Sequence, residues 1–273
     1  MKRILLLLTA VILCGTLTMN GQARKTTNRP SAKARTTSAA KATPKAKAAT
    51  PATPATPASD LPLFCLKGKV KKLTEKKFIW GYTDPVYDSN GYIDEQKSKM
   101  GLESWGSTIY SFTEDGFLSG YETIAPDGSR TPHEFTTDAK GRLTKATYDE
   151  MLEGEELIKA AMVIKRNAAG KASSFIIRAN NDPSYELWSR CLTLRPNGKI
   201  SKIANNSEYD NWNEIYSYDA NGMLTKITYK NEIGTFVNNM KYDPTRDAQG
   251  NWLKCEKSGR DDEVIEREIE YYE

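Results

Sequence analysis

The stretch YSYDANGMLTKITYK, from Tyr216 to Lys230, contains two short runs of strand-forming residues on either side of an Asn-Gly pair. In the first run Tyr216 and Tyr218 alternate with polar residues, which is the period of a strand with one buried face. Asn-Gly between two such runs is a strong signal for a tight turn, because glycine accepts a positive φ. The stretch therefore predicts one β-hairpin.

Similar sequence motifs recur along the chain. YDSNGYI begins at Tyr87, YSFTEDGFLSGY at Tyr110 and DAKGRLTKATY at Asp138. The turn glycines follow one another at intervals of 23 to 29 residues, which indicates a repeat rather than a chance series of turns. The candidate repeat-turn residues are Gly68, Gly91, Gly116, Gly141, Gly170, Gly198, Gly222 and Gly250, and Gly68 fits the pattern least well.

Apolar residues also recur two and five positions after each glycine, as Leu224 and Ile227 do after Gly222. An odd separation places two residues on opposite faces of a regular strand, so either a bulge follows the turn or both faces are partly covered. We predict an all-β fold, an antiparallel meander of hairpins with roughly 13 to 16 strands, curled into a barrel-like or half-wrapped sheet.

The pattern Tyr-Asp-x-x-Gly-x-Leu-x-x-x-x-x-Tyr resembles the YD repeats, also called Rhs repeats, of bacterial surface and secreted proteins, and it covers about residues 85–260. The resemblance implies sheet strips that wrap into shells or barrels. It also implies roles such as carbohydrate binding, adhesion or enclosure of a toxin. We expect no toxin domain here, because the sequence leaves no room for one after Glu273.

Residues 1–23 have the composition of a signal peptide, with a basic start, an apolar run, and Gly21 and Ala23 as the small residues of a cleavage site. Cys14 is preceded by Leu13, whereas a lipoprotein signal requires a small residue there. We expect export to the periplasm, cell surface or medium. No later segment is long and apolar enough to span a membrane as a helix. This leader and the small size resemble secreted proteins of the Bacteroides group.

Residues 24–59 contain almost only Ala, Thr, Pro, Lys, Arg and Ser, with eight basic residues and no acid. Such a segment has little to bury and predicts a disordered linker before a folded domain at 60–273. The domain carries 29 basic and 35 acidic residues, a formal charge of −6. The linker's scattered basic residues lack interleaved aromatics, which favours a spacer over attachment to an anionic polymer, and we expect no specific nucleic-acid partner.

Three cysteines remain after the leader, at positions 65, 191 and 255, enough for one disulfide and one thiol in an exported protein. Cys65 and Cys255 lie near opposite ends of the domain. A bond between them would hold the first and last strands together.

Signals for metal or nucleophilic chemistry are weak. The stretch DSNGYIDEQK, at 88–97, matches part of a calcium loop, but Val86 and Lys97 stand where its first and twelfth positions need carboxylates. His133 is the only histidine and lies in RTPHEF at the expected start of a strand, with no nucleophile motif. We expect no metal, no cofactor and no catalytic residue.

Acidic residues gather in two places, Glu153, Glu155 and Glu156 in one and Asp261, Asp262, Glu263 and Glu266 in the other. A glycosidase needs only two carboxylates held ~5 to 10 Å apart. A polysaccharide hydrolase therefore stays open as an alternative function.

Aromatic residues give the stronger functional signal, because five tryptophans and fourteen tyrosines exceed what a small β domain needs for its core. Flat aromatic faces beside Asn and Asp suit stacking on sugar rings, although cross-strand packing also explains them. We interpret the chain as a non-enzymatic binding or structural module of the cell envelope, with a carbohydrate or envelope polymer as first ligand. A protein partner bound through sheet edges is the other alternative. The candidate ligand-binding residues are Trp188, Tyr209, Trp212 and Tyr216.

Overall fold

The computed structural model describes residues 59–84, 86–94, 96–151, 157–179, 186–207 and 211–273. They form one antiparallel sheet of 15 strands in the order β4-β3-β2-β1-β15-β14-β13-β12-β11-β10-β9-β8-β7-β6-β5, and one short 3-10 helix, η2 (Leu61–Phe64). The strands are β1 (Val70–Asp84), β2 (Lys99–Phe112), β3 (Leu118–Ile124), β4 (Arg130–Thr131), β5 (Glu134–Thr137), β6 (Leu143–Met151), β7 (Leu157–Arg166), β8 (Ala172–Ala179), β9 (Glu186–Leu194), β10 (Ile200–Ser207), β11 (Asn211–Tyr218), β12 (Leu224–Lys230), β13 (Thr235–Tyr242), β14 (Lys254–Gly259) and β15 (Glu263–Tyr271).

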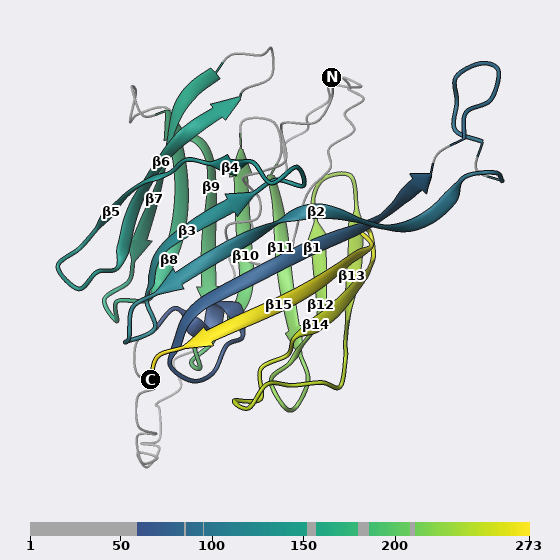
Figure 1. Ribbon diagram of the computed structural model, residues 1–273. Helices are drawn as coiled ribbons and strands as arrows, with labels where there is room; N and C mark the ends of the chain where they lie inside the picture. The colour runs from purple at the N-terminus through teal and green to yellow at the C-terminus, as the bar shows by residue number, and fades with distance from the viewer. Residues whose placement is uncertain (1–58, 85, 95, 152–156, 180–185, 208–210) are drawn as a thin grey trace, which may run out of the picture.

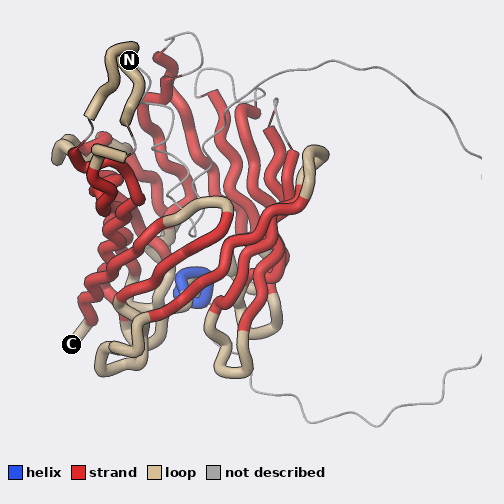
Figure 2. The backbone as a smooth tube through the Cα atoms, turned by 90° about the vertical axis from the view of Figure 1, so that its right-hand side faces the viewer, coloured by secondary structure: helices blue, strands red, loops and turns tan. Residues whose placement is uncertain are grey.

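The first and last long strands are neighbours, because β1 pairs with β15 from Val70–Tyr271 to Ile79–Glu263. The two free edges of the sheet are β4 and β5, which follow each other in the chain. The sheet curls around an interior, as Figures 1 and 2 show, but does not close into a barrel. The half-wrapped meander predicted from the repeat is confirmed.

Eight turns of the described chain contain a glycine with φ between 71° and 83°; six lie at one end of the sheet, and the two between β1 and β2 and between β3 and β4 lie at the other. In every case the glycine N–H donates to the carbonyl three residues earlier, as Gly222 does to Asp219. These glycines are Gly91, Gly116, Gly128, Gly141, Gly170, Gly198, Gly222 and Gly250. Gly128, between β3 and β4, lies outside the predicted repeat register. Gly68 has a positive φ but lies between η2 and β1 instead of in a hairpin.

A bulge follows the turn in most hairpins and explains the odd spacing of apolar residues. In β12 the pairing shifts between Leu224 and Lys226, so Thr225 is the extra residue. Leu224 and Ile227 are therefore both buried in the interior. The hydroxyl of Thr225 donates to the Ser217 carbonyl across the hairpin at 3.2 Å. Equivalent hydroxyls make the same bond at three other bulges, from Thr144, Ser173 and Ser201.

The interior at the turn end is apolar and is filled by η2, which Figure 2 shows inside the curl of the sheet. Leu61, Leu63 and Phe64 are buried there. Asp60, just before the helix, is also buried and accepts a 3.0 Å bond from the Leu118 N–H, next to the β2–β3 turn.

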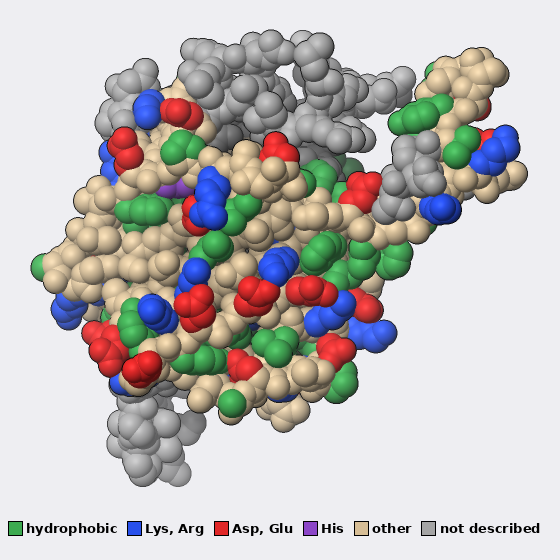
Figure 3. Space-filling view, in the orientation of Figure 1, with side chains coloured by type: hydrophobic (Ala, Val, Ile, Leu, Met, Phe, Trp, Pro, Cys, Tyr) green, Lys and Arg blue, Asp and Glu red, His purple; other side chains and the backbone are tan. Residues whose placement is uncertain are grey.

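Further from the turns the interior is polar and holds three buried ion pairs. Glu75 in β1 contacts Arg267 in β15 at 2.5 Å, Lys257 in β14 contacts Glu263 in β15 at 2.9 Å, and Arg190 in β9 contacts Glu214 in β11 at 2.7 Å. The outer face carries exposed pairs instead, such as Lys72 with Glu270, and Figure 3 shows basic and acidic side chains alternating across it.

Strands β1 and β2 continue beyond the rest of the sheet. The β1–β15 ladder ends at Ile79 and the β2–β3 ladder begins at Ser107, so residues 80–84 and 99–102 pair only with each other in the described structure. We call this two-stranded ribbon the arm. Figure 1 shows it projecting from the body of the sheet.

Cys65, Cys191 and Cys255 are free thiols, so the disulfide expected between Cys65 and Cys255 is wrong. Cys65 ends η2 in a left-handed conformation, and Cys255 lies on the inner face of β14 and is fully buried. The strand pairing between β1 and β15 makes the connection that the disulfide was expected to make.

Candidate functional site

Three of the four aromatic residues predicted to bind a ligand lie together, but in the interior. The rings of Trp212 and Tyr216 in β11 are buried, and both donate to the carboxylate of Glu214, from Nε1 at 3.2 Å and from the hydroxyl at 2.5 Å. Trp188 in β9 is half-buried, with the Arg190 guanidinium 5.4 Å from its ring centroid. The predicted Tyr209 lies outside the described residues.

Glu214 is the centre of this cluster because its carboxylate also accepts bonds from Arg190 at 2.7 Å and from the Asn205 amide at 2.9 Å. Burial raises the pKa of Tyr216 well above its ordinary value of 10, and the neighbouring Glu214 carboxylate acts in the same direction. Tyr216 therefore stays protonated and donates. The cluster orders the interior, and the ligand-binding role of its aromatic residues stays a prediction.

Two of the acidic residues near the end of the chain lie in an ion cluster, whereas Glu266 pairs with Lys254 at 2.8 Å and Asp262 accepts a 3.0 Å bond from the Gly259 N–H. Lys257 Nζ contacts Glu263 at 2.9 Å and Asp261 at 3.7 Å, and the Asn238 amide donates to Asp261 at 3.1 Å. Of the second acidic group, Glu153, Glu155 and Glu156 lie outside the described residues.

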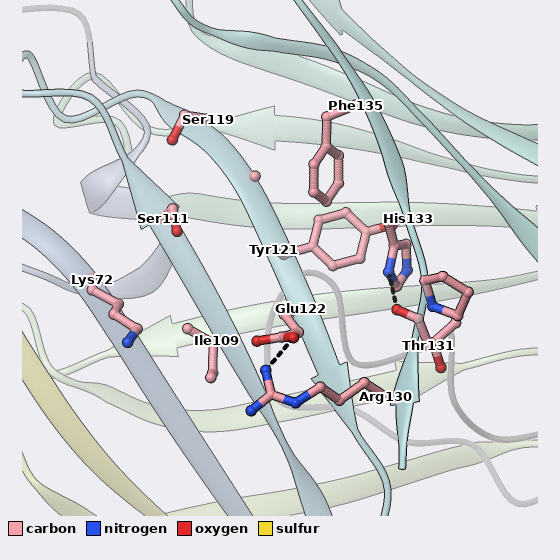
Figure 4. Close-up of a pocket in the computed structure, with 12 residues that line it drawn as sticks. Lys72, Ile109, Ser111, Ser119, Tyr121, Glu122, Arg130, Thr131, His133 and Phe135 are labelled. Atoms are coloured by element: carbon pink, nitrogen blue, oxygen red, sulfur yellow. Dashed lines mark hydrogen bonds and ion pairs between the residues drawn. The ribbon is translucent and has the colours of Figure 1, made fainter.

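A surface groove lies along the seam between the two edges of the sheet. Its volume is about 570 Å³, and it is lined by residues of β1, β2, β3 and β4, by the connecting residues 132 and 133, and by Phe135 in β5. We call it the seam groove; Figure 4 shows its lining. Pro132 and His133 connect β4 to β5, so the chain itself crosses the seam here.

One side of the seam groove is an aromatic cluster that joins the two edges. The ring of Tyr121 in β3 lies 4.5 Å from His133 and 5.5 Å from Phe135. His133 and Phe135 are stacked with an interplanar angle of 5° and centroids 5.9 Å apart. His133 also contacts Tyr148 in β6 at 5.5 Å. No ladder hydrogen bonds join β4 to β5 in the described structure. Packing between aromatic rings holds the two edges together instead.

The other side of the seam groove is polar. Lys72, Ser111 and Ser119 line it, and Arg130 forms an ion pair with Glu122, as the dashed line in Figure 4 shows. The groove therefore combines an aromatic wall, hydroxyl groups and a charged pair that can both donate and accept.

His133 is held in one tautomer. Its Nδ1 lies 2.8 Å from the Thr131 carbonyl, which only accepts, so Nδ1 carries the proton. Burial lowers the pKa of His133 below its ordinary value of 6.5, while the Thr131 carbonyl and the Glu122 carboxylate act in the opposite direction. The lone histidine, purple in Figure 3, reaches the surface beside hydrophobic side chains. The sequence placed it correctly at a strand start but gave no sign of the groove.

Within the described residues no group of three or more His, Cys, Asp or Glu side chains could hold a metal ion. The described part of the chain also contains no helix with the length and hydropathy of a membrane span. The calcium-like stretch forms a turn in which the Asp88 carboxylate accepts bonds from the N–H groups of Asn90 at 2.8 Å and Tyr92 at 2.9 Å.

No protein-family model matches the chain, and no curated protein matches it. Among solved structures, a porin-like protein from Bacteroides uniformis is similar over 75% of this chain and 99% of that one, with 10% identity and a TM-score of 0.43. The TcdB2-TccC3-TEV structure is similar over 66% of this chain, with 13% identity and a TM-score of 0.30. The Photorhabdus luminescens Tc holotoxin pore matches over 69%, with 13% identity and a TM-score of 0.26.

This chain spans 9% and 12% of the two toxin-complex chains. At these TM-scores the similarities carry no conclusion about function. The likeness to YD repeats rests on the sequence pattern.

Proposed function

We propose that this chain is an exported, non-catalytic module that binds carbohydrate in the seam groove. The observation that supports this most is the combination, in one groove of about 570 Å³, of the stacked His133–Phe135 pair with hydroxyl groups and the Arg130–Glu122 pair. A saccharide presents flat C–H faces and rings of hydroxyls. Aromatic rings suit the faces, and groups that donate and accept suit the hydroxyls.

Phe135 is the side chain best placed to contact a sugar. It remains 42% exposed although His133 and Tyr121 pack against it, so part of its ring is available at the groove. The ring also packs close to Gly120, where an added Cβ would lie 3.4 Å from Phe135. The flat wall is therefore present before a ligand binds, which lowers the entropy cost of binding.

Binding is favoured over hydrolysis by the charges of the groove. Glu122 is the one carboxylate among the described residues that line the groove, and it pairs with Arg130. Glycoside hydrolysis by the usual route needs a second carboxylate across the scissile bond. Of the described acidic candidates near the end of the chain, Asp261 and Glu263 contact Lys257 in the interior cluster, and Glu266 pairs with Lys254. The residues that line the groove do not include any of these three.

The test is calorimetry of the exported chain against a panel of soluble neutral and acidic glycans at two salt concentrations. We expect binding that survives high salt and is lost on Phe135→Leu, which keeps an apolar side chain but removes the flat ring. Phe236→Leu is the matched control, because Phe236 in β13 is similarly exposed at 37% and lies outside the groove.

Two results would overturn this proposal. One is the absence of binding to any glycan by a folded chain, and the other is equal loss of affinity in the two phenylalanine variants. Release of shorter sugars during long incubation would instead support a hydrolase. If Trp212→Ala abolishes binding while the chain stays folded and Phe135→Leu does not, the site predicted from the sequence is the right one.

A further inference from the structure

The arm exposes large apolar side chains on a single face. Trp80 is 53% exposed, Met100 56% and Leu102 40%. Trp80 pairs directly with Leu102, and Met100 lies two positions along β2 on the same face. A projecting ribbon with a continuous apolar face is unusual on a monomer and marks an interaction surface.

The arm also has an open backbone edge. Residues 99–104 of β2 pair with β1 on one side, and the described chain places no strand on their other side, because the ladder with β3 starts at Ser107. The N–H and C=O groups along such an edge can pair with another extended segment.

The sequence of this edge, Lys99-Met100-Gly101-Leu102-Glu103, is complementary to itself in the antiparallel direction. About a two-fold axis at Gly101, Lys99 lies opposite Glu103 of a second molecule, Met100 opposite Leu102, and Gly101 opposite Gly101. Opposite charges and apolar pairs directly across an antiparallel ladder each contribute roughly 0.2–1 kcal/mol. A two-fold axis makes every contact twice.

We propose that the arm binds a second copy of this chain, by antiparallel pairing of residues 99–103 of β2 with the same residues of the other molecule. Shifting the axis by one residue to Leu102 would put Lys99 opposite Trp105, which removes the charge pairs, and would leave Leu102 opposite itself as the one pair between two apolar side chains. In the proposed register Trp80 extends the apolar row, since it lies beside Leu102. Gly101 brings no side chain to the axis.

The pairing surface is small, about five residues from each molecule, which is the size of a weak or transient interface. We therefore expect a dimer that forms in a concentration-dependent way. Molecules attached to one surface would reach higher effective concentrations, which favours such an interface.

Sedimentation equilibrium of the exported chain from about 1 μM to about 1 mM tests the proposal. We expect a monomer–dimer equilibrium that Glu103→Lys weakens at least about tenfold, because lysines would then face each other at positions 99 and 103. The double variant Lys99→Glu, Glu103→Lys restores the opposite charges and should restore the dimer. Lys241→Glu, which alters the exposed Lys241–Glu256 pair on β13 and β14, is the control and should leave the equilibrium unchanged.

The register has its own test. Opposite Cα atoms in an antiparallel ladder are ~4.5–5.5 Å apart, within disulfide reach. In a Cys191→Ser background, Gly101→Cys should form a disulfide-linked dimer under copper-phenanthroline oxidation. Lys99→Cys should not, since two such residues would lie ~13 Å apart. A monomer at all concentrations, a dimer unaffected by Glu103→Lys, or equal cross-linking at 99 and 101 would overturn the proposal.

Discussion

At the scale of single residues, the interior depends most on Glu214, whose buried carboxylate accepts bonds from four side chains. Glu214→Gln keeps the size of the side chain but removes the negative charge that faces the buried Arg190 guanidinium. Removing one partner of a buried ion pair costs about 3–5 kcal/mol. We expect that loss in the free energy of unfolding, measured by urea denaturation followed through tryptophan fluorescence.

Glu256→Gln is the control for this charge loss. Glu256 pairs with Lys241 at 3.5 Å, but both side chains are exposed, at 53% and 83%. An exposed pair contributes less than about 1 kcal/mol. If the two variants lose equal stability, Glu214 does not hold the interior together in the way described.

The direction in which the rings of β11 point could not be predicted from the sequence. Tyr216, Trp212 and their neighbours were recognisable as an aromatic group, but the sequence did not show whether their rings face solvent or the interior. That depends on Glu214, between them in β11, which points the same way and needs donors once it is buried. A buried carboxylate must be hydrogen-bonded, so its neighbours become its donors.

At the scale of elements, the repeated hairpin is stabilised by a hydroxyl in its bulge. Thr225 is exposed, yet its hydroxyl donates to the carbonyl of Ser217, at the point where the pairing between β11 and β12 shifts by one residue. Thr225→Val keeps the shape and removes this bond, so we expect a loss of about 0.5–1.5 kcal/mol in the free energy of unfolding by urea. Thr228→Val, in the same strand but outside the bulge, is the control, and an equal loss there would contradict the role of the hydroxyl.

The hairpins were predictable because each is local. Asp219, Gly222 and the bulge residue Thr225 lie within seven residues of one another, so turn chemistry and apolar spacing specify the unit without distant contacts. The arm was not predictable, since its strands read like the others. What sets it apart is where the neighbouring strands end, at Glu263 and Ile124, far along the chain.

At the scale of the whole molecule, Asp60 links parts of the sheet that are distant in strand order. Its carboxylate accepts bonds from the Leu118 N–H at 3.0 Å at the start of β3, and from Arg166 in β7 at 2.9 Å. Asp60→Asn removes the charge from a buried pair, and we expect a loss of about 3–5 kcal/mol by urea denaturation.

Asp127→Asn is the matched change for Asp60. Asp127 accepts a 2.9 Å bond from the Ser129 N–H in an exposed turn, so only a small effect is expected there. If Asp60→Asn also lowers the free energy of unfolding only slightly, the bonds of Asp60 contribute little to the stability of the sheet.

The seam groove was not predictable from the sequence for a related reason. Tyr121 and Phe135 belong to strands near opposite ends of the sheet order, and they meet only because the sheet curls. The curl results from the twist between neighbouring strands, added up over fifteen strands. No single residue or motif in the sequence therefore indicates it.

The same curl makes the seam sensitive to pH through His133, whose pKa is lowered by burial among Tyr121, Phe135 and Tyr148. An opened seam would bind a proton at the ordinary pKa of 6.5, more tightly than the closed one. Seam stability is therefore full above pH 6.5 and falls as the pH drops through the lowered pKa. We expect hydrogen-exchange protection factors of the β6 amides, and glycan affinity, to decrease between pH 7.5 and pH 5.

His133→Phe separates this effect from general acid destabilisation, because a phenyl ring can keep the stack with Phe135 but cannot be protonated. In that variant the β6 protection factors should depend much less on pH, and amides of β12, on the far side of the sheet from the seam, serve as an internal reference in both proteins. Protection that stays constant from pH 7.5 to pH 5 would exclude the switch, and so would an equal decrease in His133→Phe. A decrease confined to the β6 amides of the native chain would identify the neutral histidine as the group that keeps the two edges of the sheet together.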